Sequence, residues 1–151
     1  MPQFHASRPR QSATIAWAPR CRVRDRVRRS GDGRPWRIGI RDGRNPGGIE
    51  RTIDLEDTAL AVSGGYGTTF EASGRYHHIF DPRTGASANS LVDVAVIGPR
   101  ATAADGLATA ICVAGEALAP TLVAAYPRTR AILTRLDGTS ITFNAKGGGG
   151  L

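Results

Sequence analysis

Cysteine is scarce in this chain, and long apolar runs are absent. The two cysteines, Cys21 and Cys112, are far apart, so the paired spacing of a zinc site is missing and at most one disulfide bond is possible. We expect Cys112 to be a buried thiol that packs as a small apolar residue. No run of about eighteen apolar residues and no apolar N-terminal signal occurs, so the sequence predicts no membrane span and, by default, a cytoplasmic location.

Lysine is scarcer still, and the positive charge is concentrated at one end of the sequence. Residues 1–44 hold twelve arginines against three aspartates, a net charge of +9, whereas residues 45–151 have a net charge of −2. A pI near 10.6 is typical of nucleic-acid binding. No helix-turn-helix, RNA-binding motif or interleaved aromatic residues accompany the arginines, so this alternative is disfavoured and we expect no nucleic-acid partner. We predict that residues 1–31 are a basic leader, disordered or frame-shifted, because its alternating arginines lack acidic partners.

Beyond the leader, apolar residues alternate with polar ones and later change to a helical period. The alternation predicts strands, and Asp137-Gly138 predicts a tight hairpin between the last two of them. Helical spacing follows, with Gly115 as a stop signal and Pro120 as a break or first-turn residue. We therefore expect an α+β fold with a mostly antiparallel sheet and two helices, one domain over 32–144, and a flexible glycine-rich tail over 145–151. The expected strands are 35–42, 50–57, 58–65, 75–80, 90–99, 129–136 and 139–143, and the expected helices are 102–114 and 116–127.

Asp105 and Thr109 are four residues apart on the first expected helix, so their side chains share one face. A carboxylate and a hydroxyl are hard oxygen donors suited to Mg²⁺, which in turn binds phosphate. A structural alternative is open: Thr102 and Asp105 have the spacing of a capping box, in which Thr102 caps the helix and Asp105 lies in its first turn.

The stretch "GRYHHIFDPRTG" (74–85) holds two adjacent histidines. Successive side chains of a strand point to opposite faces, so at most one of His77 and His78 faces a given site. Either histidine can be a hydrogen-bonded structural residue, and His78 can also be a proton acceptor. Ser63-Gly64-Gly65 can bring backbone N–H groups near a phosphate or can be an ordinary turn.

The order and spacing of these segments are more informative than any one segment alone. The order "SGGYGTTFEASGRYHHIFDPRTG", then "VDVAVIGP", then "ATAADGLATAICVAG" resembles the C-terminal half of the FAD:protein FMN transferases, the ApbE family. The shared motifs are a Ser-Gly segment, His-x-x-Asp-Pro-x-Thr-Gly, and Ala-Asp-x-x-x-Thr. Upstream, "GDGRPWRIGI" is similar to the family's Trp-x-Ile-Gly-Ile strand. The resemblance covers roughly residues 31–143.

The resemblance implies an activity and a role for each matched residue. These enzymes bind FAD and Mg²⁺ and transfer FMN to a Thr or Ser hydroxyl of an acceptor flavoprotein, with release of AMP. It implies Asp105 and Thr109 as metal ligands, His78 rather than His77 as the catalytic histidine, and Ser63, Gly64 and His78 at the cofactor. The family's N-terminal half and its lipoprotein signal, which accompanies export of many members, have no counterpart here. We therefore expect a truncated member, with an FAD pyrophosphatase that releases FMN and AMP, or an inactive remnant, as alternatives.

Overall fold

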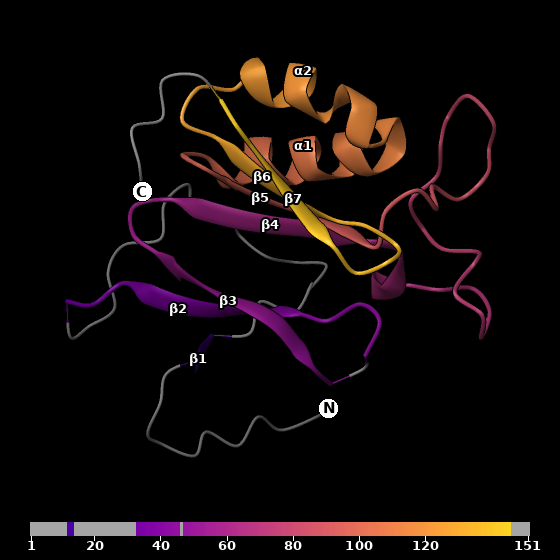
Figure 1. The fold of residues 1–151 in the computed structure, drawn as a ribbon, viewed down its shortest axis with the longest axis horizontal. Coiled ribbons are helices and arrows are strands. Elements are labelled where there is room, and N and C mark those ends of the chain that lie inside the picture. Colours follow the sequence, from indigo (N-terminus) through magenta and orange to yellow (C-terminus); the bar gives the residue numbers. More distant parts are fainter. Residues whose placement is uncertain (1–11, 14–32, 46, 146–151) are drawn as a thin grey trace.

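Two sheets lie one above the other, and a pair of helices covers the outer face of the larger sheet (Figure 1). The structure, a computed structural model, describes residues 12–13, 33–45 and 47–145. Most of the expected leader and nearly all of the expected tail lie outside these residues, so the domain limits stay a prediction. The described elements confirm an α+β fold with a mostly antiparallel arrangement.

The smaller sheet has the order β1-β2-β3 and the larger one β4-β5-β6-β7. All neighbouring strands run antiparallel except β1 and β2, which are parallel. The strands are β1 (Ser12–Ala13), β2 (Trp36–Arg41), β3 (Ile49–Leu55), β4 (Ala59–Gly64), β5 (Asp93–Gly98), β6 (Arg130–Thr134) and β7 (Ser140–Asn144). The helices are α1 (Ala101–Ala114) and α2 (Ala119–Ala124), with short 3₁₀ turns η1 (Gly65–Gly67) and η2 (Glu116–Leu118).

Strand β5 is buried on both faces and divides the core in two. Val94 and Val96 face the helices and pack in the cluster that contains Leu107 and Ile111 of α1. The alternate residues Ala95 and Ile97 face the smaller sheet, where they pack with side chains of β2 and β3. The alternation in the sequence predicted these two faces, and the structure shows why neither is polar: each is covered by another layer.

Helix α1 begins one residue earlier than expected and without a side-chain cap. Arg100 is the N-cap residue, and its side chain makes no capping hydrogen bond. The expectation that Thr102 caps the helix is therefore wrong, because Thr102 already lies inside the helix. Gly115 ends α1 as expected, with a φ of +81° and its N–H bonded to the Ile111 carbonyl at 2.8 Å.

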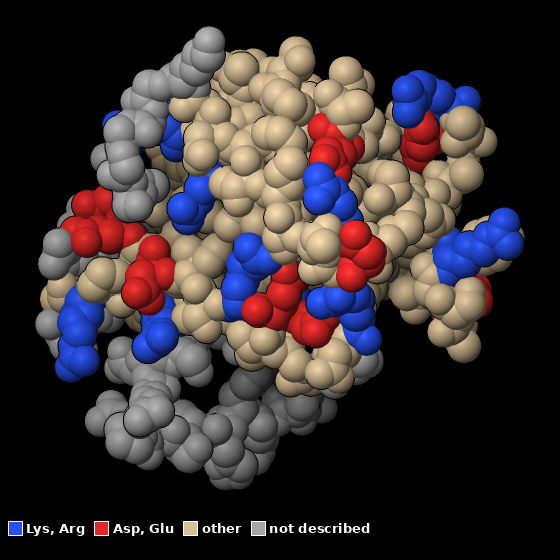
Figure 2. All heavy atoms as spheres, in the orientation of Figure 1, with Lys and Arg blue, Asp and Glu red and all other residues tan. Residues whose placement is uncertain are grey.

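The second helical segment is shorter than the sequence predicted. Pro120 lies in the first turn of α2, which is one of the two positions expected for it, and η2 replaces the start of the expected helix 116–127. None of the helices in the described part of the chain is long and apolar enough to cross a membrane. Figure 2 shows basic and acidic side chains interspersed over the visible face rather than separated by sign.

The segment 75–80 is not a regular strand, and this corrects the sequence prediction. It lies in the long connection between η1 and β5 and makes only isolated bridges, Thr69 with His77 and Phe80 with Ser87. The alternation of exposed and buried residues nevertheless holds, since His77 and Ile79 are buried whereas His78 and Phe80 are exposed. Extended backbone suffices for this alternation, and a few backbone hydrogen bonds to residues 68–70 and 88, together with side-chain hydrogen bonds from Ser87, hold the segment.

Candidate functional site

Strand β4 ends against the middle of α1, and this junction brings two of the candidate residues together. The Ser63 and Thr109 hydroxyls lie 2.9 Å apart, although 46 residues separate them in sequence. Next to them the Cys112 thiol donates to the Ser63 carbonyl at 3.2 Å. Burial raises the pKa of this thiol to about 12, so Cys112 is the inert buried thiol that the sequence predicted.

Asp105 lies one helical turn before Thr109 and is exposed. Its carboxylate has no hydrogen-bond or ion-pair partner within the described residues, and the structure gives it no capping role. The junction therefore offers a free carboxylate and two hydroxyl groups, which are the oxygen donors that Mg²⁺ prefers. No group of three or more His, Cys, Asp and Glu side chains suited to a metal occurs in the described part of the chain. The donor set thus fits Mg²⁺ in chemistry and leaves further ligand positions to oxygen atoms of other kinds.

The glycines after Ser63 allow close packing that any side chain would block. A Cβ atom on Gly64 would lie 2.7 Å from the Tyr66 ring and 3.0 Å from the Asp93 Cβ, and one on Gly65 would lie 2.6 Å from the His77 ring. The segment that leaves β4 is therefore fixed between β5 and the histidine-containing loop.

His77 is a structural residue by its contacts. Its ring is 2 % exposed, and both ring nitrogens have partners. The Ile79 N–H donates to Nδ1 at 3.2 Å, and Nε2 donates to the Asn89 Oδ1 at 3.2 Å. The Asn89 amide nitrogen donates in turn to the carbonyls of Arg75 and Ser87, which orients its oxygen toward His77.

His78 is exposed and has only one of its ring nitrogens engaged. Its Nδ1 lies 3.2 Å from the Thr68 carbonyl, and because a carbonyl only accepts, Nδ1 carries the proton. Nε2 is then the unprotonated nitrogen and has no partner in the part of the chain that the structure describes. The imidazole packs beside Gly67 and has no hydrogen bond to Ser63 or Thr109 among the described residues.

Asp81, Pro82 and Gly85 form the turn that follows the histidines. The Gly85 N–H donates to the Asp81 carbonyl at 2.8 Å, and Gly85 has a φ of +69°. The Asp81 carboxylate accepts from the Arg83 side chain and backbone, and these hydrogen bonds lower its pKa to about 2. The Asp-Pro-x-Thr-Gly motif therefore shapes the loop that presents His78.

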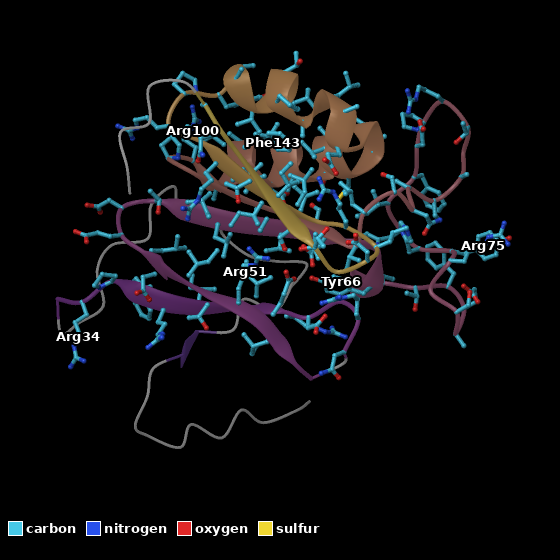
Figure 3. All side chains as sticks on the ribbon, in the orientation of Figure 1. Arg34, Arg51, Tyr66, Arg75, Arg100 and Phe143 are labelled. Atoms are coloured by element: carbon cyan, nitrogen blue, oxygen red, sulfur yellow. The ribbon has the colours of Figure 1, made fainter. Side chains whose placement is uncertain are left out.

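Sequence reasoning missed a polar cluster between the two sheets, close to the end of β4. Asp93 is 1 % exposed, and burial, followed by the nearby Glu50 carboxylate, raises its pKa to about 6 against the lowering effect of neighbouring hydroxyls. The Tyr66 hydroxyl lies 3.4 Å from Asp93 Oδ2, and burial raises the Tyr66 pKa as well. Glu50 accepts from the Thr134 hydroxyl at 3.1 Å and from Arg51, so hydrogen bonds link β3 to β6. Figure 3 shows Arg51 and Tyr66 in the region between the two sheets. The signal in the sequence was Asp93 itself, the only charged residue in an apolar run.

The comparisons with known proteins agree on one family. A profile of the ApbE family matches residues 9–133, a span that includes part of the expected leader. The FAD:protein FMN transferase of Rhodobacter capsulatus is 37 % identical over 129 residues, which are 79 % of this chain and 24 % of the relative. The FAD:protein FMN transferase of Treponema pallidum is 40 % identical over 114 residues, 72 % of this chain and 28 % of the relative. The chain thus spans about a quarter of the length of these curated relatives, which their names describe as enzymes.

Two solved structures show the same fold. The ApbE protein of Thermotoga maritima superposes with a TM-score of 0.64 at 30 % identity, covering 79 % of this chain and 38 % of that structure. The flavin transferase ApbE of Vibrio cholerae superposes with a TM-score of 0.61 at 30 % identity, covering 82 % of this chain and 40 % of that structure. The family profile matches most of this chain, and these relatives are at least 30 % identical to it. The chain therefore belongs to the ApbE family.

Proposed function

We propose that this chain contributes the proton-accepting histidine and the metal-binding helix of an FAD:protein FMN transferase. The carrying observation is the hydrogen bond from His78 Nδ1 to the Thr68 carbonyl, which leaves Nε2 as a free, exposed proton acceptor. His77 has no such nitrogen, since both of its ring nitrogens are used inside the loop. The names of the relatives supply the substrate, FAD, and the group transferred, FMN.

The proposed reaction exchanges the phosphoanhydride bond of FAD for a phosphate ester bond to the acceptor. The oxygen of an acceptor Ser or Thr hydroxyl forms a bond to the phosphorus of the FMN half of FAD. The bond from that phosphorus to the bridging oxygen breaks, and AMP leaves with the bridging oxygen. His78 Nε2 takes the hydroxyl proton as the oxygen attacks.

Asp105 and Thr109 are the residues that would hold Mg²⁺, which neutralises phosphate charge when it is bound. The Asp105 carboxylate is free for this role in the described part of the chain, and Thr109 lies beside it on the same helix face. Ser63 and Gly64 are the residues that would hydrogen-bond phosphate oxygens, and the 2.9 Å contact between the Ser63 and Thr109 hydroxyls supports this assignment.

The transfer experiment uses the chain alone and the chain fused to the preceding part of the Vibrio cholerae transferase. Each is mixed with FAD, Mg²⁺ and an acceptor flavoprotein, and covalently bound flavin is followed by its fluorescence in a denaturing gel. His78→Ala should lower the rate by about 10²–10⁴-fold, the cost of losing a general base. His77→Gln, which keeps a polar group toward Asn89, should retain most of the rate. A larger loss at His77, or release of free FMN and AMP without labelled acceptor, would contradict the proposal.

The metal site has a separate test that needs no turnover. Asp105→Asn should abolish the binding of Mn²⁺, used as a paramagnetic substitute for Mg²⁺ and measured by electron paramagnetic resonance. Asp57→Asn is the charge-matched control, because Asp57 is exposed in the β3–β4 turn and its φ of +49° is tolerated by Asn. Equal Mn²⁺ binding by both variants would remove Asp105 from the metal site.

A further inference from the structure

The backbone around His78 is a short two-stranded ribbon. The Phe70 N–H donates to the Tyr76 carbonyl at 2.8 Å, and the His78 N–H donates to the Thr68 carbonyl at 3.2 Å. Residues opposite each other in an antiparallel pair share a face, so Phe70 lies beside Tyr76 and Thr68 beside His78. Phe80, two residues beyond His78, lies on the same side. We call Phe70, Tyr76, His78 and Phe80 the aromatic face.

The aromatic face is exposed although its side chains are large. Phe70 is 60 % exposed, Tyr76 55 % and Phe80 49 %, and the two phenylalanine rings stack with centroids 6.0 Å apart and planes inclined by 17°. The other side of the ribbon, with His77 and Ile79, is buried. Single exposed apolar residues are ordinary, but three together around a candidate catalytic histidine indicate a binding surface.

The shape of this region favours a macromolecular partner. The loop between η1 and β5 projects from the body of the molecule (Figure 1), and Figure 3 places Arg75 at its outer end. Small-molecule sites are concave and enclose most of their ligand, which a projecting ribbon cannot do. The cavities near Tyr126 and near Arg130 involve no side chain of the aromatic face. Exposed aromatic residues beside an arginine are the composition of protein interfaces.

One charged side chain beside the aromatic face, Arg75, is available to an acidic partner. The Glu71 carboxylate accepts hydrogen bonds from Ser73, Arg75 and Tyr76 within the loop, and these lower its pKa to about 2. The Asp81 carboxylate is engaged with Arg83 in the turn. The Arg75 guanidinium lies 5.6 Å from the centre of the Tyr76 ring and has no acidic partner among the described residues. Glu71 and Asp81 stay ionised but face donors inside the loop, whereas the Arg75 guanidinium is paired with no carboxylate of the described residues and is open to an acidic side chain of a partner.

We propose that the aromatic face binds the acceptor polypeptide, as an extended acidic segment with apolar side chains. The apolar side chains pack on Phe70 and Phe80, an acidic side chain pairs with Arg75, and the segment presents its Ser or Thr hydroxyl to His78 Nε2. This inference rests on the proposed function for the identity of the partner. It deepens that function because it assigns acceptor binding to the loop and leaves FAD to the junction of β4 and α1.

Two fluorescently labelled peptides test this proposal on the chain itself, without FAD or metal. Both have a central threonine flanked by leucine and valine, and the remaining positions are aspartate in one and lysine in the other. The chain should bind the aspartate peptide at least about tenfold more tightly in fluorescence anisotropy. Arg75→Glu should reverse the preference, because it replaces the free positive charge with a negative one. No binding of either peptide, or a preference unchanged by Arg75→Glu, would overturn the proposal.

The aromatic contribution has its own variants and control. Phe70→Ser combined with Phe80→Ser should weaken binding of the aspartate peptide by about tenfold or more. Leu136→Ser should leave it unchanged, since Leu136 is 64 % exposed at the tip of the β6–β7 hairpin. Circular dichroism checks that each variant is folded. If the double variant instead weakens FAD binding, measured by flavin fluorescence, and leaves peptide binding intact, the face belongs to the flavin and the proposal is wrong. Failure of peptide binding would leave the transfer assay with the fused enzyme untouched, so the two proposals can fail separately.

Discussion

Adjacent identical residues can have opposite roles when their hydrogen bonds differ. His77 accepts at Nδ1 and donates at Nε2 inside a buried contact network, whereas His78 donates at Nδ1 and keeps Nε2 free at the surface. The sequence motif implied His78 only through the residues that follow it. The hydrogen bonds give an independent physical reason for the same choice, because a general base needs an accessible lone pair.

Asp93 supplies a prediction about stability and pH. Its pKa is raised from 3.8 to about 6 by burial, with Glu50 adding to the increase, while hydroxyls of Thr134 and Tyr66 and the charge of Arg51 act in the opposite direction. Between pH 4 and 6 the unfolded chain therefore releases this proton while the folded chain keeps it. The free energy of unfolding should fall across this interval, by roughly 3 kcal/mol from this group alone, and level off above it.

Asp93→Asn is the variant that checks this assignment. It should lose the decrease between pH 4 and 6 and should be at least as stable as the original chain at pH 7, in urea unfolding followed by circular dichroism. Glu71 and Asp81 have pKa values lowered from 4.5 and 3.8 to about 2, so their contribution is lost as the pH falls from those ordinary values toward 2, mostly below this interval. An Asp93→Asn variant that is less stable than the original at pH 7 would mean that the ionised carboxylate is needed at the sheet interface.

At the scale of elements, alanine at two glycine positions should change the free energy of unfolding in opposite directions. Gly106 lies inside α1, and nothing lies within 4 Å of the position that an alanine methyl group would take, so Gly106→Ala should raise the free energy of unfolding by about 0.5–1 kcal/mol. Gly65 lies in η1 against the His77 ring, so Gly65→Ala should lower the free energy of unfolding by about 1–3 kcal/mol. Urea unfolding of the two variants provides the comparison. A stabilised Gly65→Ala would show that the ring of His77 moves aside freely and that the loop is not fixed by this contact.

The elements also show where sequence reasoning succeeds. Strands β2 to β7 and helix α1 were predictable because their apolar residues recur with the period of the element. The position of the β6–β7 hairpin was predictable, but the length of its loop was not. The Arg135 N–H donates to the Thr139 carbonyl at 2.9 Å, and the loop that this bond closes holds Gly138 at a φ of +88°. In segment 75–80 the predicted alternation was right and the predicted regular strand was wrong, because the backbone makes only isolated bridges to residues 69 and 87 and is held in addition by the Ser87 side chain.

Contacts between distant segments set the limit of that reasoning. The Ser63–Thr109 contact depends on how β4 packs against α1, and the Asp93 cluster depends on how two sheets stack. Neither packing is encoded in local periodicity, so the sequence could supply the residue types of a metal site but not their contact. The prediction that Thr102 caps α1 was wrong for a related reason. The chain leaves β5 at Gly98 and begins the helix at Ala101, which puts Arg100 rather than Thr102 at the N-cap position.

At the scale of the whole molecule, the described chain has a protected centre and unequal edges. β5 and β6 have a strand on each side, and Val94 and Val96 are 0 % exposed. β4 pairs only with β5 among the described strands, and its Val62 is 37 % exposed. β4 is therefore an open edge of the larger sheet within the described residues.

This arrangement predicts a gradient of amide hydrogen exchange. Amides of β5 and β6 that point into the sheet should exchange only through global unfolding, whereas the β4 amides that point away from β5 should exchange through local opening, with far smaller protection. Mass spectrometry or NMR of the isolated chain measures both classes under the same conditions. Fusion to the preceding part of the Vibrio cholerae transferase should raise protection at β4 and leave β5 nearly unchanged, because only β4 gains a neighbour. Full protection of the β4 edge in the isolated chain, independent of protein concentration, would contradict this view and would require another segment of the same chain to cover that strand.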